Sequence, residues 1–155
     1  MPRRKLVITG HWCHLFAAGL PFGLIAMTTP AQALSCAVTP QSVPFGSYDT
    51  RGSAPVDGVG TIRVACDADT SFTVSVGRGS GSYEAREMRN GTDVLDYNLY
   101  TDAGRTIVWG DQTMGGSTVS GSGTSVDLAI YGRIPARQNV KAGVYSDAVT
   151  MTVNF

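Results

Sequence analysis

The last eleven residues of the chain, 145–155, alternate between two kinds of side chain with a period of two. The even-numbered positions are small or polar, and the odd-numbered positions carry Tyr145, Asp147, Val149, Met151, Val153 and Phe155. A β-strand places alternate side chains on opposite faces, whereas a helix would scatter these residues around its circumference. The pattern therefore predicts a half-buried strand. Because chain ends usually fray, we expect so regular an end to be docked in a groove or held by another chain.

The first 33 residues have the three-part plan of a secretory signal peptide. A basic start at residues 2–5 is followed by an apolar run, and Ala31-Gln32-Ala33 supplies small residues at a cleavage point. Glycine, histidine and proline interrupt the run, which leaves too little continuous apolar length for a membrane anchor. We therefore predict a cleaved signal peptide over residues 1–33 and a single mature domain over residues 34–155.

Removal of this segment excludes several classes of function. Both histidines of the chain, His11 and His14, lie within it, so the mature domain has none. That excludes a Ser-His-Asp or Cys-His catalytic centre and the usual zinc ligand sets. Loss of its three basic residues turns a balance of twelve basic and twelve acidic side chains into a formal net charge of −3. The mature domain also lacks the basic patch that nucleic-acid binders need.

The cysteines predict one disulfide. Cys13 belongs to the signal peptide, and Cys36 and Cys66 remain in a compartment that permits disulfides. In the chain-entropy model, closing a loop of about thirty residues stabilises a fold by roughly 3–4 kcal/mol. The alternative is a pair of buried free thiols.

The mature domain consists of short alternating segments separated by turn-forming residues, with no convincing helix. Residues 83–88 are long enough for one helical turn, and Asn90-Gly91 after them resembles a hairpin turn. The glycine-rich and polar stretch 110–123 is expected to be a loop. The expected strands are residues 43–48, 60–66, 71–77, 94–101, 106–109, 125–131 and 145–155. This pattern indicates an all-β, antiparallel sandwich.

Three carboxylates offer the best case for an enzyme or a metal site. Asp96, Asp102 and Asp111 could form a glycosidase pair or collect Ca²⁺ with loop carbonyls. Their spacing fits no calcium-loop pattern, and aspartate is common beside glycine in turns for backbone reasons. We therefore predict a protein that is not an enzyme and has no catalytic, metal-binding or cofactor-binding residues.

Several aromatic residues have two interpretations. Tyr97, Tyr100, Trp109 and Tyr131 could form a binding surface, but such residues more often fill or line the core of a sandwich. If the domain binds a carbohydrate or another surface, Tyr100 and Trp109 beside the 110–123 loop are the candidate binding residues.

Seven segments resemble, in order, the spore coat protein U domain, which is also used by subunits of Csu-type (archaic) chaperone–usher pili. The resemblance covers essentially all of the mature chain. The segments are Cys36-Ala37-Val38, Phe45-Gly46-Ser47-Tyr48, Ile62-Arg63-Val64-Ala65-Cys66, residues 95–102, Trp109-Gly110-Asp111, residues 130–136 and residues 142–147.

The resemblance implies an incomplete immunoglobulin-like sandwich that lacks its last strand. In such pilins a periplasmic chaperone lends a strand to the open groove, and at the outer-membrane usher the N-terminal extension of the next subunit replaces it. It implies a chaperone, an usher and other pilin subunits as partners, membrane contact only through usher-mediated secretion, and a place in a fimbrium or coat at the cell surface. The expected donor-strand interface is Tyr145, Val149, Met151, Val153 and Phe155.

One departure from the pilin pattern concerns the N-terminus. A donor segment needs roughly ten residues at about 3.3 Å of rise each, but only Leu34 and Ser35 separate the predicted cleavage site from Cys36. We expect a subunit that accepts a strand without donating one, at a tip or another terminal position. The alternatives are a carbohydrate- or surface-binding adhesin domain and a self-contained spore or cell coat protein.

Overall fold

The computed structural model describes residues 34–113 and 115–155. The predicted signal peptide, residues 1–33, lies outside the described residues and stays a prediction.

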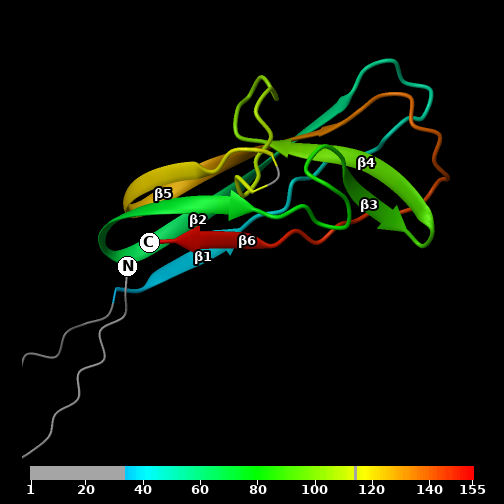
Figure 1. The fold of residues 1–155 in the computed structure, drawn as a ribbon. Coiled ribbons are helices and arrows are strands. Elements are labelled where there is room, and N and C mark those ends of the chain that lie inside the picture. The colour runs from blue at the N-terminus through cyan, green and yellow to red at the C-terminus, as the bar shows by residue number, and fades with distance from the viewer. Residues whose placement is uncertain (1–33, 114) are drawn as a thin grey trace, which may run out of the picture. The chain divides into compact units, whose positions relative to one another are not determined.

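The described part of the chain forms a six-stranded antiparallel sheet, shown in Figure 1. The strand order is β1-β2-β5-β4-β3, and β6 pairs with β2 outside this path. No helix occurs among the described residues, and none of them forms a segment able to cross a membrane as a helix. The all-β, antiparallel prediction is confirmed. The strands are β1 (Cys36–Pro40), β2 (Val56–Val76), β3 (Arg86–Asn90), β4 (Asp93–Tyr100), β5 (Val119–Ile134) and β6 (Met151–Asn154).

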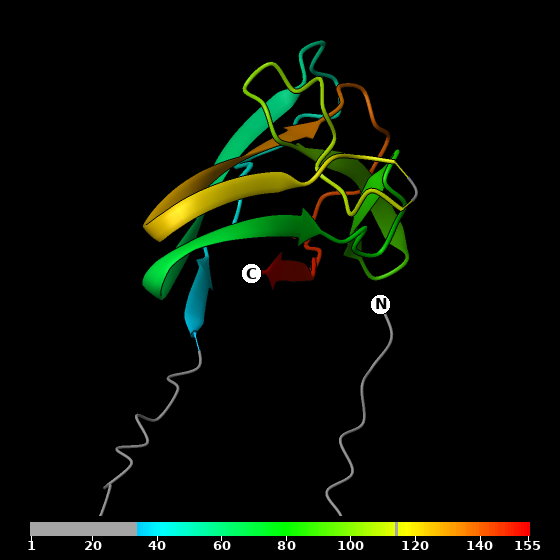
Figure 2. The same cartoon turned by 60° about the vertical axis from the view of Figure 1, so that its left-hand side comes forward.

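Two long strands, β2 and β5, give the sheet its curl. They pair from Val56 opposite Ile134 to Val74 opposite Val119, with a register shift between Ala65 and Thr70. A bulge of this kind bends a strand and increases its twist, and Figure 2 shows both strands turning back on themselves. The sequence had predicted two separate strands, 60–66 and 71–77, where β2 is continuous.

The predicted loop over residues 110–123 was wrong at its end, since β5 begins at Val119. Small residues there pair with the second half of β2. A Cβ atom at Gly121 would lie 2.7 Å from the Phe72 ring, so this glycine makes room for a core side chain. Glycine content indicated a loop, but here the glycine serves close packing within a strand.

Other predicted elements differ in their details. Residues 43–48 are irregular, and the first strand lies upstream of them and ends at Pro40. Residues 83–88 form no helical turn, and β3 starts at Arg86 instead. The predicted turn at Asn90-Gly91 is confirmed, with Gly91 at a φ of 61° in the β3–β4 hairpin. The predicted strand 106–109 is reduced to isolated bridges at Val108 and Trp109.

The buried core contains Trp109, which is 0% exposed and donates its indole N–H to the Val74 carbonyl oxygen at 3.0 Å. Its proposed role in surface binding was therefore wrong, and the interpretation of such aromatics as core residues holds for Trp109. The core cluster consists of Ile62, Val64, Phe72, Val74, Val76, Met88, Leu95, Tyr97, Leu99, Trp109, Ile130 and Ile134.

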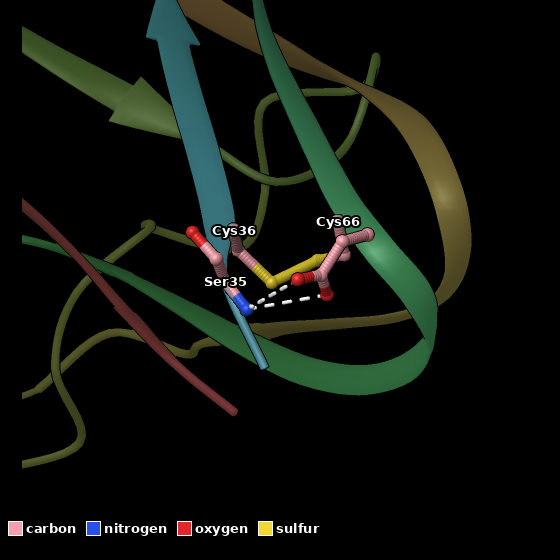
Figure 3. Close-up of a disulfide and its surroundings, with 4 residues drawn as sticks. Ser35, Cys36 and Cys66 are labelled. Atoms are coloured by element: carbon pink, nitrogen blue, oxygen red, sulfur yellow. Dashed lines mark hydrogen bonds between the residues drawn. A yellow bond between two sulfur atoms is a disulfide. The ribbon is translucent and has the colours of Figure 1, made fainter. Parts of the chain in front are cut away.

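The predicted disulfide joins Cys36 and Cys66 and is confirmed (Figure 3). The two cysteines lie directly opposite each other in the β1–β2 ladder. Ser35 reinforces the link, because its N–H donates to the Asp67 carboxylate at 3.1–3.2 Å and its carbonyl accepts from the Asp67 N–H. The start of β1 is therefore fastened to β2 covalently and by hydrogen bonds.

A buried arginine, Arg86, joins three parts of the fold. Its side chain is 0% exposed, and its guanidinium donates to the carbonyl oxygens of Val76, Gly77 and Trp109 and to Oδ1 of Asn98. All four acceptors are neutral, and burial lowers the pKa of Arg86 below its usual range. The fork of N–H groups thus ties the end of β2 to β4 and to the segment before β5.

We expect Arg86→Met to lower the free energy of unfolding by about 3–5 kcal/mol, because several buried carbonyl oxygens would lose their donors. Arg89→Met is the matched control on the same strand, where the side chain is 48% exposed and paired with Glu87. Its cost should stay below about 0.5 kcal/mol. Urea unfolding of both variants gives the comparison, and equal costs would contradict a structural role for Arg86.

Candidate functional site

A groove of about 1050 Å³ opens onto the core between two irregular segments of the chain. We call it the core groove, and we call its two sides the first rim (residues 41–50) and the second rim (residues 140–150). Its floor is made of core side chains from β3, β4 and β5, which are Met88, Leu95, Tyr97, Leu99, Ile130 and Ile134. The floor of the groove is therefore apolar and consists of side chains that are at most 8% exposed.

The first rim packs tightly on the sheet because glycines lie beneath it. Gly58 and Gly132 are directly opposite each other in β2 and β5. A Cβ atom at Gly132 would lie 2.6 Å from the Phe45 ring, and one at Gly58 would lie 2.6 Å from the Pro44 carbonyl oxygen. The ring of Phe45 also meets Tyr97 edge-to-face at 5.8 Å. Only glycine leaves room for the rim at this distance from the sheet.

Tyr48 fixes the far end of the first rim. Its hydroxyl donates to the Pro135 carbonyl oxygen at 2.9 Å and accepts from the Gln138 N–H at 2.7 Å. The near end continues the β1–β2 ladder by one bond, from the Gln41 N–H to the Thr61 carbonyl oxygen at 2.8 Å. Side chains, rather than a backbone ladder, hold the rim between these two points.

Side chains of the second rim and of β6 follow the alternation seen in the sequence. The odd-numbered residues from Tyr145 to Val153 are half-buried, and the even-numbered ones are exposed. Only β6 has a regular ladder, so the predicted strand 145–155 is shorter than expected. Tyr145, Val149 and Met151 line the core groove. The odd-numbered series thus supplies one wall of the groove.

The backbone of the second rim is hydrogen-bonded on one side. Ser146 exchanges both of its backbone hydrogen bonds with Arg89, at 2.9 and 3.2 Å, and the Thr150 carbonyl oxygen accepts from the Gly77 N–H at 2.8 Å. Within residues 34–113 and 115–155, the N–H and C=O groups of Tyr145, Asp147, Ala148 and Val149 have no backbone partner, and the Ala148 N–H donates to the Asp147 carboxylate instead. Because alternate residues of an extended chain direct these groups to opposite sides, those of the odd-numbered residues point away from the sheet.

Two residues of the expected interface lie elsewhere. Val153 is opposite Val74 in the β6–β2 ladder and packs against the core beyond the groove. Phe155 is 58% exposed and lines a separate shallow depression with Phe72 and Gly121. No sequence pattern predicts the first rim as a groove wall, although Phe45-Gly46-Ser47-Tyr48 is among the segments that carry the family resemblance.

The remaining candidate residues do not line the core groove. Tyr100 is half-buried and lies opposite Tyr131 in the β4–β5 ladder. The Asp102 carboxylate accepts from Ile107 and Thr106 in its own turn, and these bonds lower its pKa. Bonds from Thr113 and Tyr83 lower the pKa of Asp111 to about 2. These two carboxylates are thus engaged in shaping loops.

The family model described as the Spore Coat Protein U domain matches residues 22–152. The chain belongs to this family. Among curated proteins, Protein U of Myxococcus xanthus is 37% identical over 125 residues, which cover 72% of this chain and 70% of that protein. The predicted family is therefore confirmed.

One solved structure supports the fold. One similar chain comes from the CsuC–CsuE chaperone–tip adhesion subunit pre-assembly complex of the archaic chaperone–usher Csu pili of Acinetobacter baumannii. The match has 22% identity and a TM-score of 0.54, and it covers 79% of this chain and 40% of the other. HdaB, the minor tip subunit of the Escherichia coli Hda pilus, matches at 20% identity with a TM-score of 0.41, over 76% of this chain and 79% of its own.

We expect Gly132→Ala to destabilise the protein by about 1–3 kcal/mol, because the new methyl group would overlap the Phe45 ring. Denaturant unfolding measures the cost. Phe45→Leu removes the ring atoms nearest Gly132, so the double variant should cost less than the sum of the single variants. Strict additivity would contradict the contact.

Proposed function

We propose that this protein is a secreted structural subunit of a chaperone–usher pilus or surface coat, and that its core groove accepts a β-strand from another chain. The observation that carries the proposal is the core groove itself. It combines an apolar floor with a second rim whose odd-numbered backbone groups lack backbone partners in the described structure. Both features suit an incomplete immunoglobulin-like sandwich completed by β-augmentation.

An added strand would both pair with the free backbone groups of the second rim and cover the apolar floor. Its backbone would pair with Tyr145, Asp147 and Val149, and its alternate apolar side chains would cover the floor. Burial of apolar surface contributes about 25 cal/mol per Å². An open edge beside apolar side chains invites aggregation unless it is covered, which favours a dedicated partner during secretion.

The partners we propose are a periplasmic chaperone, an outer-membrane usher and other pilin subunits. Support comes from the family and from the fold shared with a chain of a Csu chaperone–subunit complex. The family and the shared fold, together with the predicted signal peptide, favour passage of this protein through the periplasm to a fimbrium or coat at the cell surface. We propose no carbohydrate site at Tyr100 and Trp109, because Trp109 is buried.

We expect Val149→Asp to abolish capture of the partner, because it places a charge on the wall of the core groove. Thr150→Asp is the matched control, since that neighbouring side chain is exposed. Tagged proteins would be recovered from the periplasm of the host and the co-purified chaperone identified and quantified. Circular dichroism and thiol assays check that both variants are folded and oxidised.

Two results would overturn the proposal. One is a wild-type protein that folds in soluble form without a partner and captures none, as a self-contained coat protein would. The other is equal capture by folded Val149→Asp and Thr150→Asp proteins, which would mean that the groove is not the binding surface.

We also propose a tip or other terminal position for the subunit. Cleavage after Ala33 would leave only two residues before the disulfide, and Ser35 is already bonded to Asp67. Such an N-terminus has no free segment to donate. N-terminal sequencing of the secreted protein should give Leu34 as the first residue, and a start ten or more residues upstream would contradict a terminal position.

A further inference from the structure

Asp147 is an unusual member of the half-buried series on the second rim. The other half-buried residues of this series are Tyr145, Val149, Met151 and Val153. The carboxylate of Asp147 is held by hydrogen bonds on both of its oxygens. Oδ2 accepts from the Tyr97 hydroxyl at 2.7 Å, and Oδ1 accepts from Ser80 Oγ at 2.9 Å, the Ser80 N–H at 3.2 Å and the Ala148 N–H at 2.9 Å.

These bonds join three separate segments of the chain. Tyr97 belongs to β4 and is a buried residue of the groove floor, and Ser80 lies in the loop that follows β2. The loop closes around the carboxylate, since a Cβ atom at Gly79 would lie 2.0 Å from Asp147 Oδ2. Gly79 has a φ of 63°, which a residue without a side chain adopts readily. The loop is therefore shaped to contact this rim residue.

The tyrosine that donates to Asp147 keeps its proton. Burial and the neighbouring carboxylate raise the pKa of Tyr97 above its usual range, so its hydroxyl stays protonated and able to donate. Hydrogen bonds to an ionised acceptor are shorter and stronger than neutral ones and hold a defined geometry.

The position of Asp147 along the rim matters as much as its partners. Backbone bonds fasten the rim at Ser146 and at Thr150, and the three residues between these points, Asp147, Ala148 and Val149, have no backbone partner in the described structure. The inward side-chain bonds of Asp147 therefore fix the rim where its own backbone N–H and C=O point toward the open side.

We propose that Asp147 is a positioning residue, which through Tyr97 and Ser80 holds the second rim in the extended geometry that an incoming strand requires. The inference rests on the proposed function of the core groove. It assigns to this carboxylate a role in recognition that is separate from covering the core. A rim held in place before binding spares the partner the cost of ordering it.

The test measures rim order and strand binding separately in Asp147→Ala and Tyr97→Phe, with Asp96→Ala as the control on an exposed aspartate of β4. Amide hydrogen exchange at Ser146, Arg89 and Gly77, whose N–H groups make the backbone bonds that fasten the rim, should speed up about tenfold or more in the first two variants, while exchange within β2 changes much less. Uniform acceleration across the sheet would overturn the proposal, because it would mean that the residue stabilises the whole fold and does not act on the rim. Unchanged exchange at the rim would overturn it as well.

Binding is measured with a synthetic peptide of about ten residues in which valine alternates with threonine, the length and pattern of an added strand. We expect Kd to rise about tenfold in Asp147→Ala and less in Tyr97→Phe, which keeps the bonds to Ser80. Asp147→Asn retains an acceptor for Ser80 and should restore part of the affinity. Unchanged affinity in Asp147→Ala would overturn the proposal. Failure of the wild-type protein to bind would instead count against the proposed function, while the exchange experiment would still test the rim.

Discussion

The backbone of the second rim is hydrogen-bonded on one side only, and the proposed ability of the core groove to accept a further strand depends on this. An extended chain directs the N–H and C=O groups of alternate residues to opposite sides. Ser146 uses both of its groups on Arg89 of β3, and the Thr150 C=O accepts from Gly77, directly after β2. Tyr145, Asp147, Ala148 and Val149 have no backbone partner in the described structure. The same odd-numbered residues turn their side chains inward. The rim therefore contributes side chains to the core while its other edge has no backbone partner among the described residues, and this is the edge at which we propose that another strand pairs.

Three kinds of contact keep the surrounding structure in place around this edge. Glycines of β2 and β5 let Phe45 and the first rim approach the sheet closely. Arg86 ties the end of β2 to β4 and to Trp109. The disulfide and Ser35 fasten the start of β1. Both rims are thus anchored on either side of the apolar floor of the groove.

Some features could be predicted because they depend on local patterns. Alternation and turn residues indicate strands, and a secreted domain with two cysteines indicates a disulfide. Other features could not be predicted from local patterns. The continuous course of β2 and β5 depends on a bulge and on cross-strand packing of Gly121 against Phe72, so glycine was interpreted as a sign of a loop. For Trp109 the sequence leaves two interpretations open, a core residue and a surface-binding residue, because no local pattern distinguishes a buried indole from an exposed one.

The sequence by itself determined the all-β class, the Cys36–Cys66 pairing, the family, and the half-buried alternation near the C-terminus. These follow from side-chain periodicity, cysteine count and motif order, which are properties of neighbouring residues or of the chain as a list. Only the tertiary structure decided that Tyr145, Val149 and Met151 line a groove while Val153 and Phe155 do not. It also assigned partners to Arg86 and Asp147. The physical reason is that these roles depend on contacts between residues far apart in the chain, such as Asp147 with Tyr97 and Ser80.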